Sequence, residues 1–189
     1  MSTTFATRTL DGVEIPAAGV YALDPAHSSV GAVARHLMVT KVRGYFRDFS
    51  GTIHIDDDPL KSWVEIEIKA DSIDTRMPAR DEHLRSPDFL DAQTYPTLTF
   101  RSTGFERTSS ESFDLHGDLT IRGITRSITL RATYGGVAPD QKGARLFFSA
   151  TGELDREAFG ITWNQALETG GVLVSKTLKL DIEIAAVSA

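Results

Sequence analysis

The stretch SIDTRMPARDEHLRSPDFLDAQTYP, from Ser72 to Pro96, interrupts a pattern that fills the rest of the chain. It holds three of the seven prolines and lacks the alternation of apolar and polar residues seen on both sides. Because proline suits the first turn of a helix, Pro78 predicts two helical turns over 79–85, and a second short helix is predicted over 87–91. We interpret the stretch as a helical insertion in an all-β protein. Its apolar face, expected to lie over whatever the strands enclose, consists of Leu84, Phe89 and Leu90.

Three predicted strands precede the insertion and five follow it. The segment from Trp63 to Ala70 shows the pattern most clearly, because its apolar and charged residues alternate as in a half-buried strand. Mostly short turns join the strands, which favours an antiparallel sheet, and closure into an eight-stranded barrel would remove its exposed edges. Residues 135–143 are predicted to form a loop, and all seven prolines lie outside the predicted strand interiors. The predicted strands are Val30–Met38, Tyr45–Ile55, Trp63–Ala70, Thr97–Thr103, Phe113–Ile121, Ser127–Tyr134, Ala144–Leu154 and Val174–Ala186.

The composition is that of one soluble domain. A chain of 189 residues with a formal charge of −6 lacks the basic surface that nucleic acid requires. Without cysteine it forms no disulfide and no thiolate metal site. The first residues lack the basic start and apolar run of a signal peptide, so we expect a cytoplasmic protein. Residues 1–19 are predicted to form an N-terminal arm with a small hairpin around Asp11-Gly12, and residues 20–189 the barrel domain.

The side chains that alternation turns inward are unusually small. An interior packed at native density would need larger residues, so together they favour an elongated apolar void. The alternative is that the glycines let strands coil and the alanines lie where the barrel tapers. An empty void would destabilise the fold through lost contacts, and a lipid would restore them. The small residues are Ala32, Ala34, Ala70, Ala132, Ala150, Ala186, Gly51, Gly117 and Gly152, and the expected lining includes Phe46, Phe49, Phe100, Phe148 and Ile128.

Several polar residues allow two interpretations. His36 has inward parity, so it is either a neutral core histidine or a polar anchor for the head of an apolar ligand. A second group of residues has the chemistry of metal ligands or acid–base catalysts, but it lacks zinc-type spacing and is also typical of a helix start and a proline turn. No nucleophile elbow, phosphate loop or dinucleotide motif is present. The second group is Asp24, His27, Arg80, Asp81 and His83.

The order of short motifs along residues 20–187 resembles the YceI-like family of bacterial polyisoprenoid-binding proteins. These motifs are Tyr21-x-Leu-Asp-Pro-x-His-Ser-x-Val, His36-Leu-Met-Val-x-Lys-Val-Arg-Gly-x-Phe, Phe49-Ser-Gly, Ser72-Ile-Asp-Thr, Arg80-Asp-x-His-Leu, Phe89-Leu-Asp, Tyr95-Pro-x-Leu-x-Phe, Gly117-Asp-Leu-Thr-Ile-x-Gly and Arg156-x-x-Phe-Gly-Ile. The resemblance implies an extended, lipocalin-like antiparallel barrel that holds a long isoprenoid or prenylated quinone-like molecule, often as a dimer. Where the family often has phenylalanine this chain has Ala32, which would widen the pocket.

These observations predict a lipid carrier, buffer or store that touches membranes transiently. The expected ligand is a bound isoprenoid lipid or quinone, and no other cofactor or metal is expected. One rival is an enzyme on a lipid-like substrate with His36 or His83 as acid–base, and another is an interaction module with a packed interior. The expected ligand-binding residues are Ala32, Ala34, His36, Met38, Phe46, Phe49, Ile53, Ile66, Phe89, Phe100, Leu119, Ile128, Phe148 and Trp163.

Overall fold

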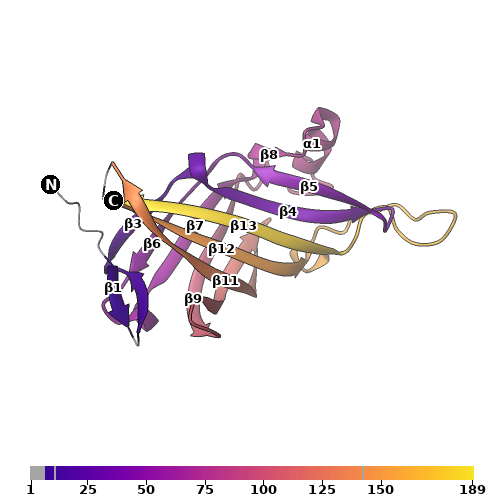
Figure 1. The fold of residues 1–189 in the computed structure, drawn as a ribbon. Coiled ribbons are helices and arrows are strands. Elements are labelled where there is room, and N and C mark those ends of the chain that lie inside the picture. The colour runs from indigo at the N-terminus through magenta and orange to yellow at the C-terminus, as the bar shows by residue number, and fades with distance from the viewer. Residues whose placement is uncertain (1–6, 11, 142) are drawn as a thin grey trace.

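The computed structural model describes residues 7–10, 12–141 and 143–189, and most of them lie in strands (Figure 1). Short 3₁₀ turns at 25–27, 59–61, 70–72 and 156–159 lie between consecutive strands. The described elements are β1 (Thr7–Leu10), β2 (Val13–Pro16), β3 (Gly19–Leu23), β4 (Ser29–His36), β5 (Thr40–Phe46), β6 (Phe49–Ile55), β7 (Trp63–Lys69), β8 (Ile73–Asp74), α1 (Pro78–Arg85), β9 (Thr97–Arg107), β10 (Ser112–Ile121), β11 (Ile124–Asp140), β12 (Gly143–Asp155) and β13 (Thr177–Ser188).

The predicted eight-stranded antiparallel barrel is confirmed. The sheet runs β12-β11-β10-β9-β7-β6-β3-β13, and pairing between β12 and β13 closes it. The strands β3 and β4 pair with successive parts of the same edge of β13, at 186–188 and 179–183, so they act as one strand broken at the 3₁₀ turn after Asp24. Proline at position 25 explains the break, because it has no N–H to donate. The strands β5 and β6 are divided in the same way, at residues 47–48.

The prediction of a loop over 135–143 was wrong. Strand β11 continues to Asp140 after a bulge between Tyr134 and Gly136, and its last residues pair with the start of β12. The bulge inserts an unpaired residue, which reverses the inward and outward parity and hides the strand pattern from the sequence. Pro139 therefore lies inside a strand, against the expectation for all seven prolines, and it pairs with Ala144 near the hairpin end.

Only the first of the two helices predicted in the insertion forms. Helix α1 spans Pro78–Arg85, which adds one residue to the predicted 79–85. The second predicted helix, over 87–91, is instead a series of hydrogen-bonded turns that fold back on α1, with the amide N–H of Leu90 donating to the carbonyl of Leu84 at 2.9 Å. Asp91 has a φ of 47°, a left-handed conformation that a continuing helix cannot adopt. As expected, Leu84, Phe89 and Leu90 face the barrel interior.

The inward glycines do not hollow the barrel. A Cβ placed on Gly117 would lie 2.3 Å from Cζ of Phe100, and one on Gly152 would lie 2.7 Å from Cδ2 of Leu130. At Gly51 the backbone carbonyl of Glu65 would be 2.5 Å away. Each glycine therefore makes room for a neighbouring strand or side chain, and the interpretation that it adds empty volume was wrong.

Candidate functional site

An elongated cavity of about 860 Å³ runs along the inside of the barrel. Its lining follows individual strands over much of their length, from Leu178 to Ile184 on β13 and from Leu98 to Phe105 on β9. The volume lies in the upper part of the range of about 300–1,000 Å³ that is typical of small-molecule pockets. The barrel therefore has room for a long guest rather than a filled core.

The cavity wall is mainly apolar, and twelve of the fourteen predicted ligand-binding residues lie on it. Alternation turns most of these side chains inward from strands on all sides of the barrel, while Phe89 comes from the insertion and Trp163 from the loop after β12. The wall therefore offers dispersion contacts along its length. The twelve residues are Ala32, Ala34, His36, Phe46, Ile53, Ile66, Phe89, Phe100, Leu119, Ile128, Phe148 and Trp163.

Two predicted residues lie elsewhere. Met38 is beyond the end of β4, with 54% of its surface exposed, because the strand turns after His36 and parity no longer applies. Phe49 is 4% exposed and is enclosed in the packed core rather than on the wall. Ala70 and Ala186, expected to face a void, are likewise fully buried without bordering it.

The N-terminal hairpin borders one end of the cavity, a contribution that the sequence did not reveal. Strands β1 and β2 form a separate two-stranded sheet, and Leu10, Ile15 and Pro16 lie on the cavity wall. Arg8 holds the hairpin in place by donating to the backbone carbonyls of Asp56 and Asp57. The predicted hairpin is thus present, while Asp11 of its turn lies outside the described residues.

Tyr134 lies on the cavity wall in the bulged part of β11. Burial, followed by the negative charge of Glu14, raises the pKa of its phenol to about 12. Its ring packs against Phe148 at a centroid distance of 5.4 Å. The phenol is therefore neutral at physiological pH, and this part of the wall carries no charge from Tyr134.

The polar residues of the insertion support its fold. Asp81 is buried and accepts hydrogen bonds from the backbone N–H and the hydroxyl of Thr75, and Arg80 also donates to that hydroxyl. His83 is hydrogen-bonded to Asp88 at 2.8 Å and its ring packs edge-on against Trp163 at 4.8 Å. These contacts fix the aromatic cover at this end of the cavity. Within the described residues, no group of three or more histidine, cysteine, aspartate or glutamate side chains is arranged to hold a metal.

Arg156 fastens the long connection between β12 and β13. Its side chain is 1% exposed, and its guanidinium donates to the backbone carbonyls of Ile161 at 2.8 Å, Trp163 at 2.9 Å and Ser175 at 2.9 Å. Burial lowers the pKa of this guanidinium. The three bonds converge on one side chain, so Arg156 holds the backbone that presents Trp163 to the cavity.

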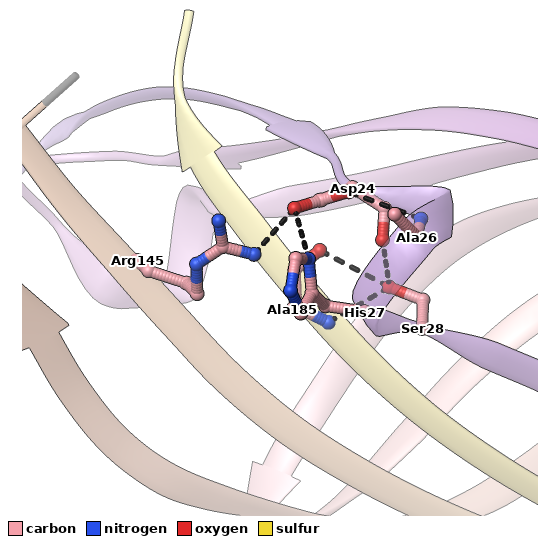
Figure 2. Close-up of polar contacts among 6 residues, drawn as sticks. All are labelled: Asp24, Ala26, His27, Ser28, Arg145 and Ala185. Atoms are coloured by element: carbon pink, nitrogen blue, oxygen red, sulfur yellow. Dashed lines mark hydrogen bonds and ion pairs between the residues drawn. The ribbon is translucent and has the colours of Figure 1, made fainter. Parts of the chain in front are cut away.

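Asp24 lies at the break between β3 and β4 and makes hydrogen bonds across it (Figure 2). Figure 2 shows its carboxylate between Arg145 and His27, with the Nδ1 of His27 at 2.8 Å. Ser28 continues the link by donating to the carbonyl of Asp24 at 2.7 Å and accepting from the N–H of Ala185 at 2.9 Å. Asp24 and His27 are therefore part of a structural junction between the broken strand and β13.

Replacing Asp24 with asparagine should remove a pH-dependent part of the stability. Hydrogen bonds from Arg145 and then His27 lower the pKa of Asp24, so its stabilising contribution is present above its unfolded pKa, about 3.9, and is lost as the pH falls through the folded value. We expect Asp24→Asn to be less stable than the wild type at pH 7 and the difference to shrink below about pH 4. Urea denaturation at several pH values checks this, and a constant difference down to pH 2 would contradict it.

Comparisons with known proteins agree with this geometry. Residues 21–186 match the family described as the YceI-like domain. A UPF0312 protein of Staphylococcus aureus (strain USA300) is 37% identical over 164 residues, covering 85% of this chain and 93% of the relative. The crystal structure of a Campylobacter jejuni YceI protein has a TM-score of 0.70 and 32% identity, over 82% of this chain and 90% of that one. A polyisoprenoid binding domain from Saccharophagus degradans shares the fold, with a TM-score of 0.68 and 13% identity over 89% of this chain and 98% of that domain.

Proposed function

The chain belongs to the YceI-like family, and from that premise we propose that it binds a long isoprenoid lipid or prenylated quinone inside the barrel and serves as its carrier, buffer or store. The observation that carries the proposal is the apolar cavity of about 860 Å³ along the barrel. The name of the S. degradans domain, which shares this fold, supports polyisoprenoids as the ligand class. The proposed role requires no catalytic step, and the contacts of His83 with Asp88 and Trp163 suit a structural cover.

The energetics favour exchange over permanent storage. Burying apolar carbon from water gains about 0.8 kcal/mol per CH₂, so several isoprene units gain ample free energy, less the cost of ordering the chain. The lipid starts in a bilayer, however, and a bilayer is as apolar as the cavity. The net free energy of transfer from membrane to barrel is therefore small, which allows loading and unloading.

The two tryptophans provide a direct test, because Trp63 and Trp163 both lie on the cavity wall. We expect a prenylated quinone to quench their fluorescence at a one-to-one stoichiometry, and organic extraction of the purified protein followed by mass spectrometry to recover an isoprenoid lipid. The same quinone head without its prenyl tail is the control and should quench only at much higher concentration. If no lipid is extracted and the prenylated quinone quenches no better than the control, the proposal fails.

A further inference from the structure

The turn between β4 and β5 exposes three consecutive apolar side chains, which we call the 37–39 tip. Leu37, Met38 and Val39 are 44%, 54% and 77% exposed. Leu37 and Met38 also have positive φ values of 52° and 61°, which asparagine and glycine adopt far more readily. Neither the exposure of these three apolar side chains nor the left-handed backbone of Leu37 and Met38 stabilises the monomer. The combination at one site therefore indicates a surface that makes its contacts outside this chain.

Basic side chains surround the 37–39 tip. Arg35, Lys41 and Arg43 are exposed, and Arg35 lies directly opposite Lys41 in the register of the hairpin. Across the described part of the chain, no ion pair joins any of the three to a carboxylate. The neighbouring loop over 164–173 adds one acid, Glu168. This end of the hairpin is thus locally basic in a protein whose formal charge is −6.

The 37–39 tip lies beside one end of the cavity. The N–H of Leu37 donates to the carbonyl of Leu173 at 2.9 Å, and His36 forms a β-bridge with Val174. His36, Leu173 and Val174 all line the cavity, whereas the three residues of the tip do not. Figure 1 shows the β4–β5 hairpin reaching the same end of the barrel as the long loop before β13. A surface on which the tip docked would therefore face this end of the cavity.

We propose that the 37–39 tip inserts into the surface of an anionic lipid bilayer and holds this end of the cavity against the membrane. A short apolar projection backed by unpaired cations fits the boundary between acyl chains and anionic head groups. A protein partner would need a broader apolar patch than three residues to bind stably. The purpose of docking rests on the proposed function, since the lipid would load and unload at this end of the cavity. Docking itself needs no isoprenoid.

Co-sedimentation with vesicles that contain no isoprenoid tests docking separately from lipid storage. We expect the full chain to bind vesicles of phosphatidylglycerol and phosphatidylcholine, and to bind pure phosphatidylcholine vesicles at least tenfold more weakly. Salt should weaken the binding, because the attraction is screened within a Debye length. Lys41→Gln/Arg43→Gln should bind the anionic vesicles about 25-fold more weakly, at about fivefold per basic residue.

A variant of the tip separates docking from folding. Leu37→Asn/Met38→Gly gives the turn residues suited to its positive φ values, so it should be at least as stable as the wild type while binding anionic vesicles at least tenfold more weakly. Leu60→Asn is the matched control, since Leu60 is 73% exposed on the turn between β6 and β7, and it should bind like the wild type. Docking is overturned if the wild type fails to sediment with anionic vesicles, or if the tip variant binds them equally well. Quinone quenching would still report separately on lipid storage.

Discussion

Replacing Arg156 with alanine is expected to lower the free energy of unfolding by about 3 kcal/mol. The substitution leaves the carbonyls of Ile161, Trp163 and Ser175 without the donor that now serves all three. A buried acceptor left unpaired costs about 1–3 kcal/mol, and removal of a buried charge offsets part of the sum. The expected change therefore exceeds the effect of most single substitutions.

Urea denaturation measures the change at Arg156 as a lower midpoint with an unchanged slope. Arg156→Lys should fall between the wild type and alanine, because an ammonium group lacks the planar fork that meets three carbonyls in fixed directions. Arg126→Ala is the matched control, since Arg126 is exposed and, among the described residues, donates only to the neighbouring carbonyl of Thr125. It should change stability by less than about 0.5 kcal/mol. A loss below about 1 kcal/mol for Arg156→Ala would show that the connection is held by other contacts.

The barrel was predictable because strand alternation is a local property. Val64, Ile66 and Ile68 of β7, which alternation placed on one face, all lie on the cavity wall. Prediction failed where the register changes, at the bulge after Tyr134 and beyond the end of β4 at Met38. Parity has no information across such points, because one extra residue exchanges the two faces of a strand.

The hollow interior was predicted for a partly wrong reason. Alanines such as Ala32 and Ala150 do border the cavity, but the space in front of Gly117 is filled by the ring of Phe100. A sequence lists the residue that is small without showing which neighbour occupies the space. The contribution of Leu10 from the N-terminal hairpin was missed for a related reason, since it depends on contact between two separate sheets.

Replacing Ala150 with tryptophan is expected to reduce lipid binding more than tenfold. Ala150 lies on the cavity wall and pairs across the strands with Ala132, another small wall residue, and with Ile182. An indole at this point would occupy space that the proposed guest needs. Displacing even two CH₂ groups costs about 1.6 kcal/mol at 0.8 kcal/mol each, and about 1.4 kcal/mol is a factor of ten in affinity. Titration with a prenylated quinone, followed by fluorescence, measures the loss relative to the wild type after correction for the added tryptophan.

The neighbouring position supplies the control that gives this result its meaning. Thr151 is exposed and lies outside the cavity lining, so Thr151→Trp adds the same side chain to the same strand on the opposite face. It should bind quinone like the wild type. The indole of Ala150→Trp enters a cavity rather than a packed core, so the unfolding midpoint should stay unchanged. Overpacking of a filled core would lower it. Unchanged quinone affinity in a folded Ala150→Trp protein would place the guest outside the barrel, since a ligand inside could not avoid the added ring.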